Sequence, residues 1–99
     1  MGKLNINCNQ DIQVKHLTIG KVRYVREIII NKDTFMYGTV GDSTQNKGEF
    51  IIIISLGDIE LVFAVRKTKE ECTGILDNIV ESILREDHDF INIIFSDEE

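Results

Sequence analysis

Two neighbouring strand-like segments are apolar on both faces, and no other feature of the sequence constrains the fold as strongly. Residues 50–54 are five apolar residues in a row, so a strand there carries apolar side chains on both sides. Residues 59–65 again place apolar side chains on both faces, and residues 28–30 and 91–94 repeat the pattern. The sequence therefore predicts a sheet that needs cover on both sides, because soluble monomers rarely expose large apolar patches.

One amphipathic helix is predicted, and it can cover only one of those faces. Thr68 and Glu71 form a Thr-x-x-Glu capping box at its start, and the helix is expected to end near Glu86. Apolar residues then recur at three-and-four spacing: Cys72, Ile75, Leu76, Ile79, Val80, Ile83 and Leu84. Gly74 within the helix is expected to let it lie close to a strand. The second sheet face is covered either by rolling into a barrel or by another copy of the chain.

Turn-forming residues divide the rest of the chain into short strands. The segment Asn31-Lys32-Asp33 is typical of a hairpin turn, because Asn and Asp tolerate left-handed backbone angles. The polar segment 41–48 is predicted to be a mobile hairpin loop, and 96–99 an acidic frayed tail. Strands are predicted over residues 4–8 (at a sheet edge), 12–19, 22–30, 34–40, 50–55, 59–67 and 90–95. We therefore predict one α+β domain, residues 1–99, with a curved antiparallel sheet of about six or seven strands and one amphipathic helix near the C-terminus.

The last predicted elements resemble the end of a pleckstrin-homology-type barrel. In Leu61-Val62-Phe63-Ala64-Val65-Arg66-Lys67 an apolar strand leads into the helix, as in that family, where a closing helix plugs a rolled sheet. The resemblance covers residues 49–86 and implies a fold without implying a function. The helix lacks the Trp that those domains usually carry, and the strand at 90–95 is additional.

Charge is unevenly distributed along the chain. Residues 1–57 carry seven basic and five acidic side chains, whereas residues 58–99 carry four basic and twelve acidic ones. An anionic half repels phosphate, so we expect no nucleic-acid or membrane binding and a partner protein with a basic surface. Lys21 and Arg23 share a strand face but Tyr24 lies on the other, so they form no basic stripe interleaved with aromatic rings. In the alternative interpretation, the charges only keep a small domain soluble.

The cysteines and the N-terminus favour a cytoplasmic protein. Cys8 and Cys72 are too few for a disulfide framework and lack the close spacing of a zinc site. The first residues do not have the basic-then-apolar layout of a secretory signal, and no Asn-x-Ser/Thr sequence occurs. The 17 isoleucines against a single alanine indicate an AT-rich coding sequence, as in low-GC bacteria or their mobile elements.

Signs of catalysis are few. His16 lies on an alternating strand, where a packed imidazole is expected. Asp87, His88 and Asp89 are the one cluster of metal-capable side chains, but three consecutive residues cannot all point at one ion without an unusual turn. We therefore assign no catalytic residue, metal ligand or cofactor. If the protein were an enzyme, these three residues would be the candidates.

These observations favour a small acidic interaction domain without enzymatic activity: an inhibitor, an immunity protein or a regulatory subunit. Its docking residues are predicted to be acidic ones that steer a basic partner and apolar ones that are buried against a partner or a second copy. The predicted docking residues are Asp77, Glu81, Asp87, Asp89, Ile51, Ile53 and Val62. A homodimer is expected. The alternative is a module that binds a small ligand or peptide at a barrel mouth or a strand edge.

Overall fold

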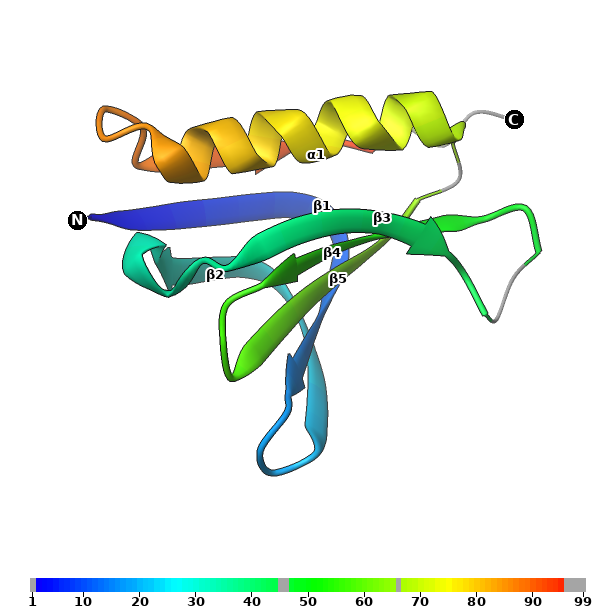
Figure 1. The fold of residues 1–99 in the computed structure, drawn as a ribbon, viewed down its shortest axis with the longest axis horizontal. Coiled ribbons are helices and arrows are strands. Elements are labelled where there is room, and N and C mark those ends of the chain that lie inside the picture. The colour runs from blue at the N-terminus through cyan, green and yellow to red at the C-terminus, as the bar shows by residue number, and fades with distance from the viewer. Residues whose placement is uncertain (1, 45–46, 66, 96–99) are drawn as a thin grey trace.

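The computed structural model describes residues 2–44, 47–65 and 67–95 (Figure 1). Along the described chain the elements are β1 (Lys3–His16), β2 (Lys21–Asn31), the 3₁₀ helix η1 (Lys32–Thr34), β3 (Tyr37–Asp42), β4 (Phe50–Ser55), β5 (Ile59–Val65), α1 (Lys69–Leu84) and β6 (Phe90–Ile93). The predicted α+β class, with one helix near the C-terminus, is confirmed. The tail 96–99, residues 45–46 of the predicted loop and residue 66 of the predicted strand 59–67 lie outside the described residues.

Strand β1 lies in the interior of the sheet. The strand order is β2-β1-β5-β4-β3, and these neighbours are antiparallel. On the side opposite β2, β1 pairs first with β6 over residues 5–8, in parallel, and then with β5 over residues 13–16. The segments 4–8 and 12–19, predicted as an edge strand and a separate strand, thus belong mostly to one long strand with neighbours on both sides.

The sheet is irregular where β1 changes neighbours. Between the pairs Asn7–Glu27 and Ile12–Val25, four residues of β1 lie opposite one residue of β2. The Asn9 side chain donates to the Phe95 carbonyl (2.8 Å) and accepts from the Phe95 amide (2.9 Å). The Gln10 side chain donates to the Ala64 carbonyl (2.5 Å). These two amides hydrogen-bond the end of β5 and the chain just beyond β6, where strand pairing with β1 is interrupted.

Helix α1 packs on β3, β4 and β6, and so covers one face of the sheet (Figure 1). It approaches β3 closely at Gly38, where a Cβ atom would lie 2.6 Å from Cδ1 of Leu76. The close approach expected at Gly74 is wrong, because a Cβ atom there would have no neighbour within 4 Å. The capping box is confirmed: Oγ1 of Thr68 accepts from the Glu71 amide (3.2 Å), and the Glu71 carboxylate accepts from the Thr68 amide (3.0 Å).

Apart from Val62, the buried apolar side chains form one cluster between the helix and the sheet. Both cysteines belong to it as free thiols, as small apolar residues would. Burial raises the pKa of both thiols. Of the predicted helix stripe, Leu84 is the exception, since 63% of it is exposed. The largest fully buried members are Phe63, Leu4, Ile6, Ile12, Ile52, Ile54, Leu61, Ile79 and Ile83.

The hairpin predicted at residues 31–33 is wrong. This segment forms η1, capped by Asn31, whose side chain accepts from the Asp33 amide (3.0 Å). It connects β2 and β3, which lie at opposite ends of the strand order. The turn-forming tendency of Asn31 is therefore used for a crossover between distant strands.

The sheet does not close into a barrel. In the described part of the chain, β2 and β3 end the strand order and do not pair with each other. The rolled barrel suggested by the pleckstrin-homology resemblance is therefore not formed. Instead, the sheet has one face under α1 and an open face on the other side, called here the outer face, which carries Ile51, Ile53, Val62 and Ala64.

Candidate functional site

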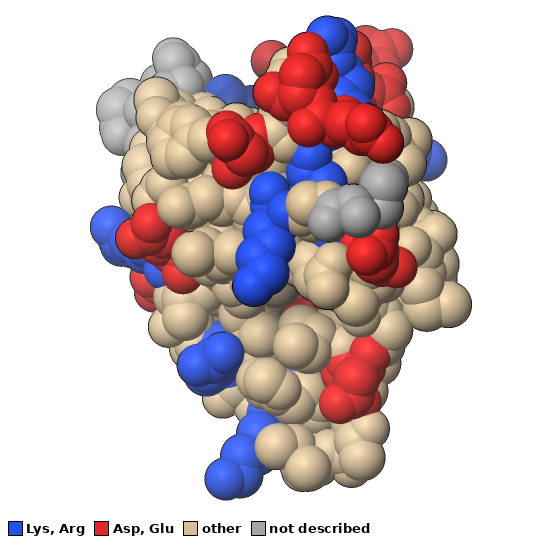
Figure 2. All heavy atoms as spheres, turned by 90° about the vertical axis from the view of Figure 1, so that its left-hand side faces the viewer, with Lys and Arg blue, Asp and Glu red and all other residues tan. Residues whose placement is uncertain are grey.

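Acidic side chains gather on α1 and on the turn that follows it. Residues 69–89 contain seven acidic side chains and two basic ones. The predicted docking residues Asp77, Glu81, Asp87 and Asp89 are all exposed. Figure 2 shows acidic side chains clustered at the top of its view, over the C-terminal end of the helix. This surface, called here the acidic helix end, consists of Asp77, Glu81, Arg85, Asp87 and Asp89.

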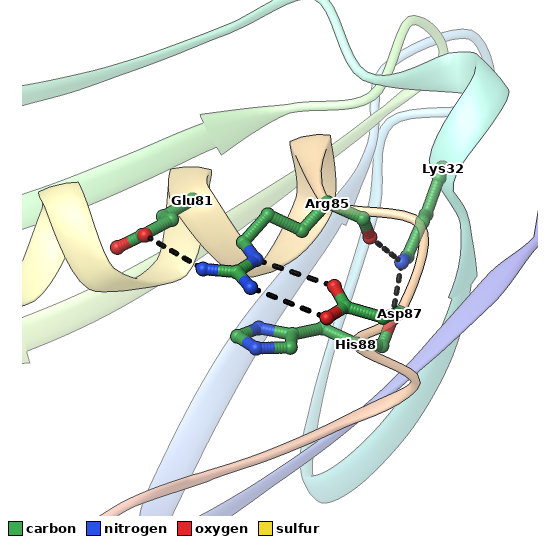
Figure 3. A network of polar contacts seen from close by, with 5 residues as sticks. All are labelled: Lys32, Glu81, Arg85, Asp87 and His88. Carbon is green, nitrogen blue, oxygen red and sulfur yellow. Dashed lines mark hydrogen bonds and ion pairs between the residues drawn. The ribbon is translucent and has the colours of Figure 1, made fainter.

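Arg85 organises part of the acidic helix end. Its guanidinium contacts both carboxylate oxygens of Asp87 at 3.2 Å and the carboxylate of Glu81 at 3.4 Å (Figure 3). The hydrogen bonds from Arg85 lower the pKa of Asp87, and those to Asp87 raise the pKa of Arg85. All three side chains are largely exposed, so the pairs add little stability and mainly set side-chain positions. In the described chain, the carboxylates of Asp77 and Asp89 have no hydrogen-bond or ion-pair partner.

Lys32 fixes the backbone beneath this surface. It comes from η1, is 6% exposed, and its ammonium donates to the carbonyl of Arg85 (2.6 Å) and to that of His88 (Figure 3). The end of an α-helix leaves carbonyls without intrahelical partners, and a cation there also interacts favourably with the helix dipole. Lys32 therefore caps α1 from another part of the chain. Sequence reasoning missed this role, because nothing local to Lys32 indicates where its ammonium points.

The apolar docking residues lie on a different side of the molecule. Ile51 and Ile53 are half-buried and Val62 is 7% exposed. All three belong to the outer face, whereas Ile54 on the same strand points towards Gly38 and the helix. The predicted acidic and apolar residues are therefore not brought together, and they form two separate surfaces on opposite sides of the sheet.

A depression of about 390 Å³ lies on the outer face. Its floor includes Ile51, Val62 and Ala64, and the predicted β3–β4 loop contributes to its rim. Tyr24 and Lys15 also line it, and no sequence pattern places these two side chains beside Ile51. The full lining is Asp11, Gln13, Lys15, Tyr24, Ser43, Thr44, Glu49, Ile51, Val62 and Ala64. Seven of these ten residues carry polar side chains, so a ligand here would be held mainly by polar contacts around a small apolar floor.

The residues considered for catalysis, Asp87, His88 and Asp89, make contacts that stabilise the fold. The Asp87 carboxylate binds Arg85, and the carbonyls of His88 and Asp89 accept hydrogen bonds from Lys32 and from the Asn5 amide. Across residues 2–44, 47–65 and 67–95, no three His, Cys, Asp or Glu side chains are grouped so that they could hold a metal ion.

In comparisons with known proteins, no family model, curated protein or solved structure matches the chain. Within the described residues, no helix has the length and apolar character needed to span a bilayer. The functional argument therefore depends on the surfaces of the molecule itself.

Proposed function

We propose that this protein is a non-enzymatic interaction domain, such as an inhibitor, an immunity protein or a regulatory subunit, and that it docks its acidic helix end on a basic partner surface. The observation that carries the proposal is the combination of excess negative charge with a fixed backbone. Asp77 and Asp89 present carboxylates that have no partner among the described residues, while Lys32 holds the turn between them in place.

A fixed acidic surface suits recognition of a basic partner. Complementary charge steers the encounter and raises the association rate more than the affinity. Side chains that are already positioned lose less conformational freedom on binding. Arg85 holds Glu81 and Asp87 in this way, and it would compete with a partner cation for Asp87. The proposal therefore assigns the largest contribution to Asp77 and Asp89.

The test begins with immobilised wild-type protein and an array of Lys- and Arg-rich peptides. The double variant Asp77→Asn/Asp89→Asn is expected to lose most of the binding. The control Asp42→Asn/Glu70→Gln removes the same charge from two other exposed sites and is expected to retain it. Binding should also weaken between about 0.05 and 0.2 M salt, because exposed charges are increasingly screened over that range.

Equal loss in both double variants would contradict the proposal, since total charge and not the acidic helix end would then determine binding. Binding that is unchanged by salt and by the Asp77→Asn/Asp89→Asn substitutions would contradict it as well. A captured partner protein, once purified, would be tested with the same two variants.

A second candidate function is supported by the depression on the outer face. We propose, as the alternative, that it takes a small polar ligand or a peptide end, with Lys15 and Tyr24 on the rim and Ile51 on the floor. A thermal-shift screen against metabolites and short peptides tests this, because a ligand that binds only the folded state raises the unfolding midpoint. The variant Ile51→Trp fills the depression and should abolish the shift. A screen in which no compound raises the midpoint argues against this candidate.

A further inference from the structure

The free edge of β2 carries an apolar segment that no described element covers. In the described strands, β2 pairs with β1 alone and ends the strand order. Its last regular part includes Ile28, Ile29 and Ile30. Long exposed edges normally carry charges or other devices that discourage pairing with another chain. These three positions carry none, so they form a candidate pairing edge.

Ile29 differs from its surroundings. It is 61% exposed, and its neighbours on that face of the strands are polar: Asn5 lies opposite it on β1, and Asn7 and Glu27 form the next pair along. The Asn5 side chain donates to the Glu27 carboxylate (3.2 Å), as expected for a solvated face. Ile29 therefore offers an exposed apolar side chain at the edge of the sheet, as Phe90 does on the other side of Asn5, where 55% of it is exposed.

The other side of the same edge borders an apolar groove of about 550 Å³. Its apolar lining comes from the isoleucines of the edge and from Leu56 and Ile59, and Asn31, Thr34 and Asp58 add polar groups. Leu17 and Met36, both exposed, lie next to the β4–β5 turn. The Leu17 amide donates to the Asp58 carbonyl and the Met36 amide to the Ser55 carbonyl, both at 2.9 Å. Apolar surface therefore continues from this edge into the groove beside it.

The residues along this edge are complementary to themselves. When two copies of an edge strand pair antiparallel about a two-fold axis, one residue faces its own copy, because outward-pointing backbone groups alternate. With Ile29 at the axis, Ile28 faces Ile30 of the partner subunit and Glu27 faces Asn31 of the partner subunit. Within residues 27–31, every apolar residue then meets an apolar one, and the one charge of this segment meets an amide.

The neighbouring registers are poorer. An axis at Ile28 would place Glu27 opposite the partner's Ile29 and Arg26 opposite the partner's Ile30. An axis at Glu27 would place two carboxylates opposite each other, which is destabilising. An axis at Ile30 would run past Asn31, where β2 ends. The pattern therefore favours one register.

We propose that two copies of this chain form a homodimer in which the two β2 strands pair antiparallel about Ile29, so that the sheet runs through both copies. This interface is independent of the acidic helix end. It is also distinct from the outer-face residues Ile51, Ile53 and Val62, which the sequence offered as the surface for a second copy.

The experiment measures oligomeric state by light scattering and sedimentation equilibrium. Wild-type protein is expected to be dimeric, with an association that is insensitive to salt because the interface is apolar. Ile29→Lys should weaken association on the order of 100-fold, since each copy loses a buried isoleucine and gains a charge facing its own copy. Ile94→Lys is the matched control, because Ile94 is 68% exposed elsewhere, and it should leave the dimer intact.

Cross-linking tests the register. Opposite Cα atoms in an antiparallel pair lie about 4.5–5.5 Å apart, within the range of a disulfide. Ile29→Cys should therefore form a covalent dimer on mild oxidation, whereas Ile94→Cys should not. Cys8 and Cys72 are buried and should not contribute in the folded protein. Circular dichroism confirms that each variant is folded.

The proposal would be overturned if the wild-type protein were monomeric both at high concentration and after 100-fold dilution. So would a dimer that survives Ile29→Lys, or equal cross-linking of the Ile29→Cys and Ile94→Cys variants. A dimer lost in Ile53→Lys but kept in Ile29→Lys would place the interface on the outer face instead. None of these outcomes depends on binding at the acidic helix end, so the two proposals fail separately.

Discussion

The two faces of strands β4 and β5 have similar compositions but very different environments. Ile52 and Ile54 are fully buried beneath α1, whereas Ile51 and Ile53, which alternate with them, are only half-buried. Composition alone could not assign these faces, because both are apolar. The difference lies in what approaches each face: Gly38 lets the helix come close on one side, and no described element packs over the other.

The outer face is nevertheless less exposed than an uncovered sheet would suggest. Val62 retains only 7% of its exposure although no helix lies over it. It lines the same depression as Gln13, Lys15 and Tyr24, whose longer side chains surround it. Neighbouring polar side chains can therefore shelter an apolar residue with their aliphatic and aromatic parts. The sequence-based prediction named only a barrel or a second copy as cover for this face and did not include such partial burial by neighbouring side chains.

The largest expected effect on stability is the difference between substitutions at two neighbouring isoleucines of β4. Ile54→Ala should lower the free energy of unfolding by about 2–5 kcal/mol, because it leaves a cavity in the core. Ile53→Ala removes the same atoms from a half-buried site and should cost clearly less. Urea denaturation of both variants measures the difference. Equal losses would show that the outer face is as well packed as the core.

The next effect concerns the attachment of the helix end. Lys32→Met keeps the packed aliphatic stem but removes the ammonium that binds the carbonyls of Arg85 and His88. Leaving buried polar groups without partners should cost about 1–3 kcal/mol. Lys69→Met, at an exposed position on the same helix, is the control and should be close to neutral. Chemical denaturation measures both, and a neutral Lys32→Met would contradict the capping role.

The close approach of helix and sheet gives a third prediction. Gly38→Val adds atoms where a Cβ atom already lies 2.6 Å from Leu76 Cδ1 and 3.1 Å from Ile54 Cδ1. Overpacking of this kind should cost about 1–3 kcal/mol, measured by thermal or urea unfolding. Gly41→Val is the control on the same strand, because the nearest atom to a Cβ there is at 3.9 Å. A similar loss in both variants would indicate a general strand effect.

On the solvent side of the helix, Gly74 should have the opposite effect. Gly74→Ala meets no atom within 4 Å and should stabilise the protein by about 0.5–1 kcal/mol, because alanine loses less conformational freedom in a helix. An increase in the unfolding midpoint checks this. A decrease would mean that the helix packs closely at Gly74 after all.

The smallest expected effect is the dependence of stability on pH. Hydrogen bonds lower the pKa of Asp87 and that of Glu71 in the folded state. Their contribution is therefore complete above the unfolded-state pKa of about 4 and is lost as pH falls through the folded-state values. Asp87→Asn should flatten the loss of thermal stability between about pH 5 and 2. Asp77→Asn is the comparison, since Asp77 has no partner in the described chain, and an equal effect there would contradict the prediction.

Elements defined by local patterns could be predicted from the sequence. The capping box at Thr68 and Glu71 and the apolar stripe of α1 specify the helix within a few residues of its observed bounds. The hairpins β3–β4 and β4–β5 follow from a polar loop and a short turn that separate segments close together in the chain. In each case the partners lie close together in the chain, so spacing alone carries the information.

Pairings between distant segments could not be predicted. The parallel pairing of β6 with β1 joins residues near opposite ends of the chain, and no local pattern distinguishes it from a hairpin. The side chain of Asn9 shows its role only through Phe95, 86 positions away. The same limit applies to the candidate sites. Periodicity predicts exposed acidic residues on a helix. It does not predict that the acidic helix end is separated from Ile51, Ile53 and Val62, because that depends on the packing of α1.

The position of β6 beside β1 has a consequence for synthesis. During translation the first strand leaves the ribosome long before residues 90–93, which hydrogen-bond along one edge of its first half. Until then that edge has none of its native partners. Leu4 and Ile6 belong to the core, which the helix does not yet cover. The native pairing of β1 can therefore be completed only after residues 90–93 have been synthesised, and until then β1 keeps an unpaired edge of the kind that favours pairing with other chains.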